Sequence, residues 1–124
     1  MDYKLFLDDY RHPPFLDIKG FKHPWEYEWV IARSMDDAIR IVKDRGLPVF
    51  IAFDHDLEDE HYDGELGQER TGYEFAKWFA NYVLDNNLEL PANFDYVVHS
   101  MNPAGAENIR AYMRNFMRFY QSNR

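Results

Sequence analysis

Acidic side chains follow two apolar segments of this sequence at the point where each segment ends. Asp8 and Asp9 follow the segment "KLFL", which is apolar after its lysine, and the run "VFIAF" leads into Asp54 and, two residues later, Asp56. Carboxylates at close range repel one another, and their burial is costly unless a positive charge neutralises them. Oxygen ligands without cysteine suit a hard cation, Mg²⁺ first and Mn²⁺ second. We therefore predict a divalent-metal site whose ligands are Asp8, Asp9, Asp54 and Asp56.

The segment "HSMNPAG" offers a second kind of chemistry. Its Asn102 precedes a proline, which is typical of a helix start, and helix starts present N–H groups and a partial positive charge. A phosphate bound there would contact the Ser100 hydroxyl and approach the backbone at Gly105. Because the unperturbed pKa of a histidine side chain is about 6.5, His99 suits a general acid or base. We therefore predict phosphate binding by Ser100, Asn102 and Gly105.

Each of these residues also has a purely structural explanation. Aspartate is common where strands end, and Asn-Pro is an ordinary helix start. Arg11 follows the first acidic pair, where its planar guanidinium would either hold a phosphate or pin a carboxylate. The catalytic roles that we predict for Asp54, His99 and Asp56 therefore depend on whether distant segments meet in space. In those roles Asp54 attacks phosphorus, or a water does so while His99 or Asp56 moves the proton.

The elements that would position these residues alternate along the chain. Strands are expected at residues 3–7, 28–33, 49–53 and 94–98. Helices are expected after the cap residues Ser34, Thr71 and Asn102. Apolar strands that alternate with helices predict a parallel sheet covered on both faces. Right-handed crossovers place the carboxyl ends of such strands at one edge, where α/β sheets bind ligands, so the acids and His99 should meet there.

Composition limits the functions that this chain can have. Its 124 residues, 46% of them apolar, predict one globular α/β domain over residues 1–124. A net charge of −8 argues against broad nonspecific binding to nucleic acid. No segment is apolar enough to span a membrane, and the absence of cysteine fits the cytoplasm. The acidic segment 57–70 and the helix face with Arg110, Arg114 and Arg118 are left without an assigned role.

Four motifs in order, "LFLDDYR", "FDHDL", "TGYEFAKW" and "HSMNPAGAENIR", resemble the cyclic-phosphate processing receiver-like domain, a relative of response-regulator receivers. The resemblance covers residues 4 to about 112. It implies a flavodoxin- or receiver-like three-layer sandwich, with about four parallel strands in the order 2-1-3-4 and helices on both faces. It also implies Mg²⁺ binding by Asp8, Asp9 and Asp54. Asp54 falls on the position that receivers phosphorylate, and Ser100 falls on their hydroxyl position.

The sequence departs from ordinary receivers where they continue to a fifth strand that ends in a lysine. No such strand is expected here, and Asp56 and His99 are not ordinary receiver features. The resemblance therefore implies a metal-dependent phosphoesterase that acts on a phosphate or cyclic phosphate of a small nucleotide or of an RNA end. The alternative is a non-enzymatic module that accepts a phosphoryl group, binds a ligand or binds a protein partner.

Overall fold

The computed structural model describes residues 2–8, 28–54, 71–99 and 103–122. Strands and helices in these ranges follow one another as β1 (Tyr3–Leu7), β2 (Glu28–Ala32), α1 (Met35–Arg45), β3 (Phe50–Phe53), α2 (Gly72–Asp85), β4 (Asp95–Val98) and α3 (Pro103–Ser122). The predicted strands are confirmed, and three of them are one residue shorter at one end. Such differences are usual, because terminal residues make only part of the ladder hydrogen bonds.

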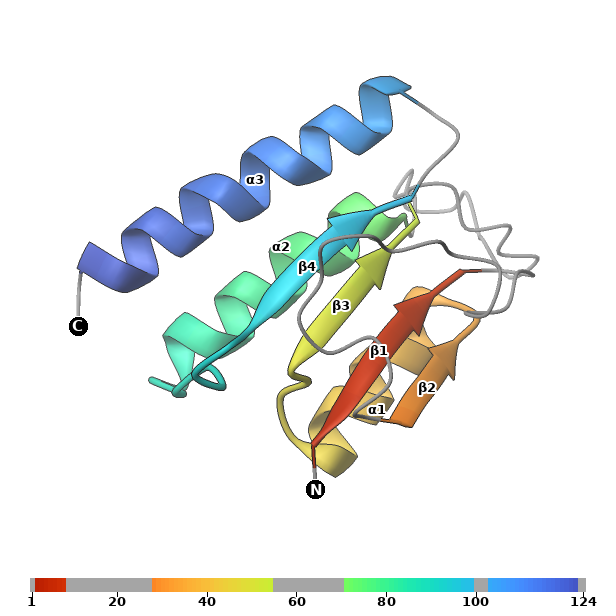
Figure 1. Cartoon of the computed structure of the whole chain (residues 1–124), viewed down its shortest axis with the longest axis horizontal. Helices are drawn as coiled ribbons and strands as arrows, with labels where there is room; N and C mark the ends of the chain where they lie inside the picture. The colour runs from red at the N-terminus through yellow and green to blue at the C-terminus, as the bar shows by residue number, and fades with distance from the viewer. Residues whose placement is uncertain (1, 9–27, 55–70, 100–102, 123–124) are drawn as a thin grey trace.

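The four strands form one sheet in the order β2-β1-β3-β4, and every neighbouring pair is parallel. Figure 1 shows the four arrows pointing to the same edge of the sheet. The predicted parallel sheet and strand order are therefore confirmed. The carboxyl ends of β1, β3 and β4 lie together at one edge, as a sheet with crossover helices requires.

One face of the sheet carries the larger apolar cluster. Along β1, Tyr3, Leu5 and Leu7 point to this face and are almost completely buried. All three helices pack against it, and their buried residues follow helical spacing. The main contributors from the helices are Ala38, Ile41, Val42, Phe75, Ala76, Phe79, Ala80, Val83, Ala106, Ile109, Met113 and Phe116. In Figure 1 the helices lie behind the sheet or beside its β4 edge.

The opposite face carries a smaller, aromatic cluster. Phe6, Phe50 and Ala52 are buried there, and Trp29 contacts both phenylalanine rings edge-on, with centroids 5.6 and 5.9 Å away. Lys4 is also buried on this face, with its Nζ atom 4.5 Å from the Trp29 ring centre, and burial lowers its pKa. Within the described ranges all helices contact the first cluster, so these ranges provide one helical layer of the expected sandwich.

Local signals in the sequence set the ends of α1 and α2. The Ser34 hydroxyl accepts a hydrogen bond from the N–H of Asp37, and the Thr71 hydroxyl accepts one from the N–H of Glu74. Both predicted caps are confirmed. Gly46 follows α1 with φ = 92°, a conformation that glycine adopts at little cost, and its N–H donates to the Val42 carbonyl.

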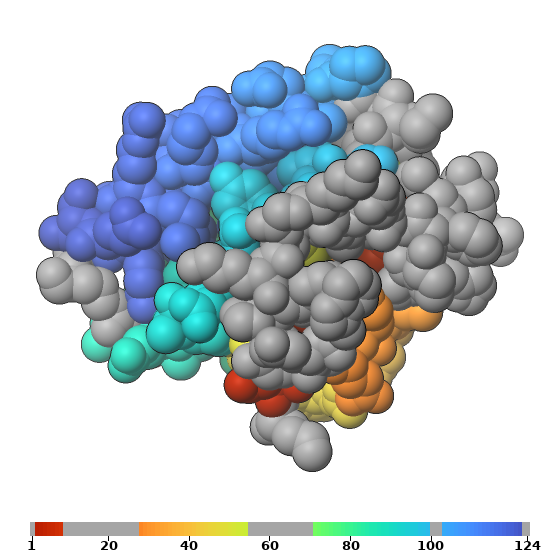
Figure 2. Space-filling model, viewed as in Figure 1, coloured from red at the N-terminus to blue at the C-terminus, as the bar shows by residue number. Residues whose placement is uncertain are grey.

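Helix α3 forms the surface of the molecule beside β4 (Figure 2). The side of α3 opposite its buried residues carries exposed arginines. A guanidinium nitrogen of Arg110 and one of Arg114 each lie 3.8 Å from a carboxylate oxygen of Glu107. Arg110 and Arg114 thus belong to a charged, solvated helix face. Within the described ranges, no helix combines the length and the apolar composition that crossing a membrane requires.

Candidate functional site

Strand alternation places three chemically active side chains on the same face of the sheet. Successive side chains of a strand point to opposite faces, so residues two apart share a face. Asp8 lies two residues after Phe6, which belongs to the smaller cluster. By the same spacing Asp54 follows Ala52, and His99 follows Val97. All three therefore project above the aromatic face at the carboxyl edge of the sheet.

The strand register also places the three residues in one row. Phe53 pairs with Val98 in the β3–β4 ladder, and Phe6 pairs with Ala52 in the β1–β3 ladder. Continuing both ladders sets Asp54 between Asp8 and His99. The backbone holds this row, because the N–H of His99 donates to the carbonyl of Phe53 at 2.8 Å.

Two further hydrogen bonds fix the end of β1. The N–H of Asp8 donates to the carbonyl of Ala32 at 3.1 Å, and the Asp8 carbonyl accepts from the guanidinium of Arg33 at 3.2 Å. The N–H of Arg33 itself donates to Asp37 at the start of α1. Hydrogen bonding to Arg40 is the main reason why the pKa of Asp37 is lowered. The backbone that carries Asp8 is therefore tied to the first turn of a helix.

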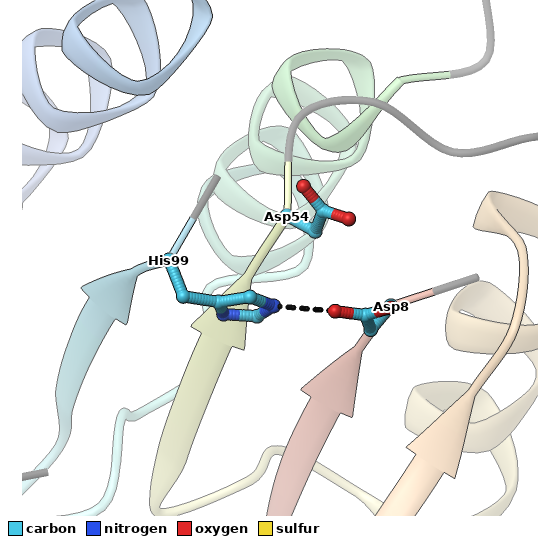
Figure 3. Close-up of side chains that lie close together, drawn as sticks. All are labelled: Asp8, Asp54 and His99. Carbon is cyan, nitrogen blue, oxygen red and sulfur yellow. Dashed lines mark hydrogen bonds and ion pairs between the residues drawn. The ribbon is translucent and has the colours of Figure 1, made fainter. Parts of the chain in front are cut away.

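His99 contacts Asp8 directly. Its Nε2 atom lies 3.0 Å from Oδ2 of Asp8, and the two side chains are 6% and 0% exposed. Figure 3 shows the imidazole extending from β4 toward β1, with Asp54 beside it. The imidazole is parallel to the Phe6 ring, with centroids 5.0 Å apart and planes within 1°. This stacking and the hydrogen bond together define the orientation of the ring.

The donor set fits a divalent cation. One ligand atom each from Asp8, Asp54 and His99 lies within 4.8 Å of the other two, and both aspartates are buried. Two buried carboxylates so close together require positive charge, and carboxylate oxygens are the preferred ligands of Mg²⁺ and Mn²⁺. His99 adds a nitrogen that can either ligate a cation or hydrogen-bond to Asp8. An ionised Asp8 accepts only, so in that state Nε2 of His99 is the donor.

The structure describes four of the predicted site residues. It brings together Asp8, Asp54 and His99, although the ligand and catalytic roles remain predictions. Gly105 is buried in the first turn of α3. The other candidates, Asp9, Arg11, Asp56, Ser100 and Asn102, lie outside the described residues.

Three neighbours of the site were not identified from the sequence alone. Phe6 stacks on the imidazole, Arg33 holds the backbone of Asp8, and Ala52 lies between Phe6 and Val97 in the row preceding the site. Alternation along β1 and β3 indicates that Phe6 and Ala52 share the face of the aspartates, so that signal was present in the sequence. The contact of Arg33 depends on how β2 aligns with β1, which no local pattern shows.

Comparisons with solved structures agree with the receiver-like fold. No curated protein matches the chain. A solved structure, the N-terminal domain of a response regulator/sensory box/GGDEF 3-domain protein from Carboxydothermus hydrogenoformans, is similar over 98% of both chains, with a TM-score of 0.51 and 19% identity. A fusion containing a yeast Spc42 trimeric coiled coil has the same score and identity, covering 98% of this chain and 83% of its own. At such identity both likenesses show the fold alone.

The family comparison extends over most of the sequence. The model of the cyclic-phosphate processing receiver domain matches residues 3–115, a range that contains every described strand and most of α3. This match includes the three residues that meet at the carboxyl edge of the sheet. The chain belongs to the cyclic-phosphate processing receiver domain family.

Proposed function

We propose that this domain is a divalent-metal-dependent phosphoesterase that opens a cyclic phosphate on a small nucleotide or on an RNA end. The observation that carries the proposal is the meeting of Asp8, Asp54 and His99, which directly follow three different strands, in a buried cluster. The family description, which names the processing of cyclic phosphates, supports the same chemistry. Asp8 and Asp54 would hold Mg²⁺ or Mn²⁺, with Asp9 and Asp56 as further proposed ligands.

The proposed reaction adds one water across one P–O bond. The water oxygen bonds to phosphorus, the bond from phosphorus to one ribose oxygen breaks, and that ribose oxygen takes up a proton. A bound divalent cation would polarise a phosphoryl oxygen and offset its charge. His99 would take the proton from the water or deliver one to the ribose oxygen, and its hydrogen bond to Asp8 holds the ring for this purpose.

Asp54 offers a second route to the same products. Its carboxylate would attack phosphorus directly and displace the ribose oxygen, giving an acyl phosphate that water then hydrolyses. Asp54 follows β3 directly and is 3% exposed, in the same cluster as His99. Phosphate binding by Arg11, Ser100, Asn102 and Gly105 would orient the substrate in either route.

The test is turnover of 2′,3′-cyclic nucleotides in Mg²⁺, in Mn²⁺ and in excess chelator, followed by phosphorus NMR. We expect conversion to a 2′- or 3′-monophosphate that needs a divalent metal and is lost in Asp54→Asn. The matched control is Asp2→Asn, which removes an exposed carboxylate just before the opposite end of β1. Absence of turnover with every nucleotide and metal, or undiminished turnover in Asp54→Asn, would refute the proposal.

A phospho-acceptor function is the second candidate, favoured by the position of Asp54 at the end of the third strand of a receiver domain. Incubation with a small phosphodonor and measurement of the intact mass separates the two functions. A stable phosphoryl adduct that is absent in Asp54→Asn would support a module that signals through a protein partner. An adduct that forms only transiently during turnover would support the esterase.

A further inference from the structure

His99 reaches Asp8 across an intervening strand. Asp8 follows β1 and His99 follows β4, and β3 lies between these strands in the sheet. Neighbouring strands are about 4.8 Å apart, so the two backbones are separated by roughly 10 Å. The imidazole nevertheless comes within 3.0 Å of the Asp8 carboxylate. The ring must therefore lie across β3, as Figure 3 shows.

The strand register indicates that the side chain of β3 nearest this ring in the preceding row is Ala52. In the strand register Ala52 pairs with Phe6 on one side and with Val97 on the other, one row before the row of the aspartates. The His99 ring is stacked on Phe6, so it leans back over that preceding row. Ala52 is completely buried on the same face. In this preceding row β3 places only the methyl group of Ala52, whereas Asp54 follows in the row of the aspartates (Figure 3).

Alanine is an unusual choice at this place. Central strands favour β-branched and aromatic residues, which pack well on a pleated surface, whereas alanine is depleted. The neighbours of Ala52 on this face follow that preference, since Phe50 lies in the same strand and Phe6 and Val97 lie in the adjacent strands. A local preference that is broken at one position, directly beside chemically active groups, points to a functional constraint.

We propose that Ala52 is a positioning residue that leaves the space over β3 through which His99 reaches Asp8. A larger side chain at position 52 would occupy that space. The imidazole would then swing away and lose both the Phe6 stack and the hydrogen bond to Asp8. The catalytic role of His99 rests on the proposed function, whereas its positioning by Ala52 does not.

A double-mutant cycle in metal-free protein tests this steric relation. When His99 is present, the larger side chain of Ala52→Val should clash with the imidazole. We expect the melting temperature of this variant to be about 5 to 10 °C below that of the wild type. In a His99→Ala background the valine occupies space that the imidazole has vacated, so the same change should lower the melting temperature by less than about 2 °C, or raise it. An equal loss in both backgrounds would overturn the proposal.

Ala76→Val serves as the control for additivity. Ala76 is a completely buried alanine of α2 in the other cluster, so the cost of enlarging it should be the same with and without His99. If Ala52→Val fails to fold, Ala52→Ser adds a single heavy atom and serves in its place. Recovery of folding by adding His99→Ala to Ala52→Val would itself support the proposal.

A spectroscopic measurement tests the contact without any mutation of His99. In the wild type, nuclear Overhauser effects should connect the His99 ring protons with the Ala52 methyl and the Phe6 ring, and Ala52→Ser should weaken those to Phe6. Absence of any effect between His99 and Ala52 in the wild type would refute the proposal. Neither measurement uses a metal or a substrate. A protein without esterase activity would therefore leave the inference about Ala52 unaffected. Failure of the inference about Ala52 would likewise leave the esterase proposal to be decided by the turnover assay.

Discussion

Replacing Asp54 with asparagine should change stability in opposite directions with and without a divalent metal. Asp8 and Asp54 are 0% and 3% exposed, and their ligand oxygens are no more than 4.8 Å apart. With an effective dielectric constant of about 20, two unit charges at that separation repel by about 3.5 kcal/mol. The contact of His99 with Asp8 offsets part of this repulsion. We therefore expect Asp54→Asn to stabilise the metal-free protein by about 1 to 2 kcal/mol.

In saturating metal, Asp54→Asn should destabilise the protein instead of stabilising it. At a free metal concentration of about 100 times the dissociation constant, binding stabilises the native state by about 2.7 kcal/mol. Asp54→Asn removes a proposed ligand and would lose most of that gain. The variant should therefore be less stable than the wild type by about 1 kcal/mol in metal, although it is the more stable protein in chelator.

Thermal unfolding in excess chelator and in saturating Mg²⁺ or Mn²⁺ measures both differences. For a domain of 124 residues, 1 to 2 kcal/mol corresponds to about 3 to 10 °C in melting temperature. Asp2→Asn should shift neither curve, because its carboxylate is exposed and lies just before the opposite end of β1. A change of the same sign in both solutions would refute the reasoning. Stabilisation in both would mean that the two carboxylates do not share a cation, and destabilisation in both would mean that their repulsion does not limit stability.

Three further predictions concern the fold. Thr71→Ala removes the hydroxyl that accepts a hydrogen bond from the N–H of Glu74, and the free energy of unfolding measured with denaturant should fall by about 1 kcal/mol. Thr71→Ser keeps a hydroxyl and should keep most of the stability. Equal losses in the two variants would contradict the capping role. At Gly46, where φ is 92°, an added Cβ would have no atom within 4 Å, so Gly46→Ala causes no clash. We expect the same assay to show a loss of about 1 kcal/mol in the free energy of unfolding, because alanine is strained at this backbone conformation. An unchanged stability would contradict that explanation. Burial raises the pKa of Tyr3, whose hydroxyl donates to the Gly46 carbonyl at 2.7 Å. The phenol therefore ionises first in the unfolded chain, from about pH 10, so stability should fall as the pH rises above that value. Between about pH 9 and about pH 11, the free energy of unfolding measured with urea should fall less in Tyr3→Phe than in the wild type. An identical fall in both proteins would refute the assignment of this pH dependence to Tyr3.

The sequence predicted the arrangement of the site because that arrangement follows from two regular features. Alternating strands and helices predict a parallel sheet, and a parallel sheet gathers the carboxyl ends of its strands at one edge. Asp8, Asp54 and His99 each follow such a strand directly. The period of two residues within each strand then determines which face of the sheet they share. Both features are local and can be read without coordinates.

The contact between His99 and Asp8 depends on features that are not local. It requires the register of β4 on β3 and of β3 on β1, which is determined by packing across the sheet. By our proposal it also requires a small residue at position 52, and the imidazole stacks on the ring at position 6; the sequence shows both residues but does not connect them with His99. The sequence therefore predicted that these residues are near one another and did not predict which of them touch.

This contact makes the role of His99 experimentally separable from that of the metal ligands. Nε2 of His99 cannot donate a proton to Asp8 and coordinate a cation at the same time, because both uses need the same nitrogen position. If His99 is a ligand, His99→Gln should weaken Mn²⁺ binding by at least tenfold in calorimetry. If His99 moves protons, the same variant should bind Mg²⁺ and Mn²⁺ almost as the wild type does and lose turnover by about 10²- to 10⁴-fold.

The oriented contact with Asp8 favours the second outcome. A carboxylate has two oxygens, so Asp8 can accept from His99 through Oδ2 and still offer Oδ1 to a cation. The ring meanwhile keeps the orientation that stacking on Phe6 gives it. We therefore expect His99→Gln to separate binding from turnover, and weakened metal binding in that variant would instead make His99 a ligand.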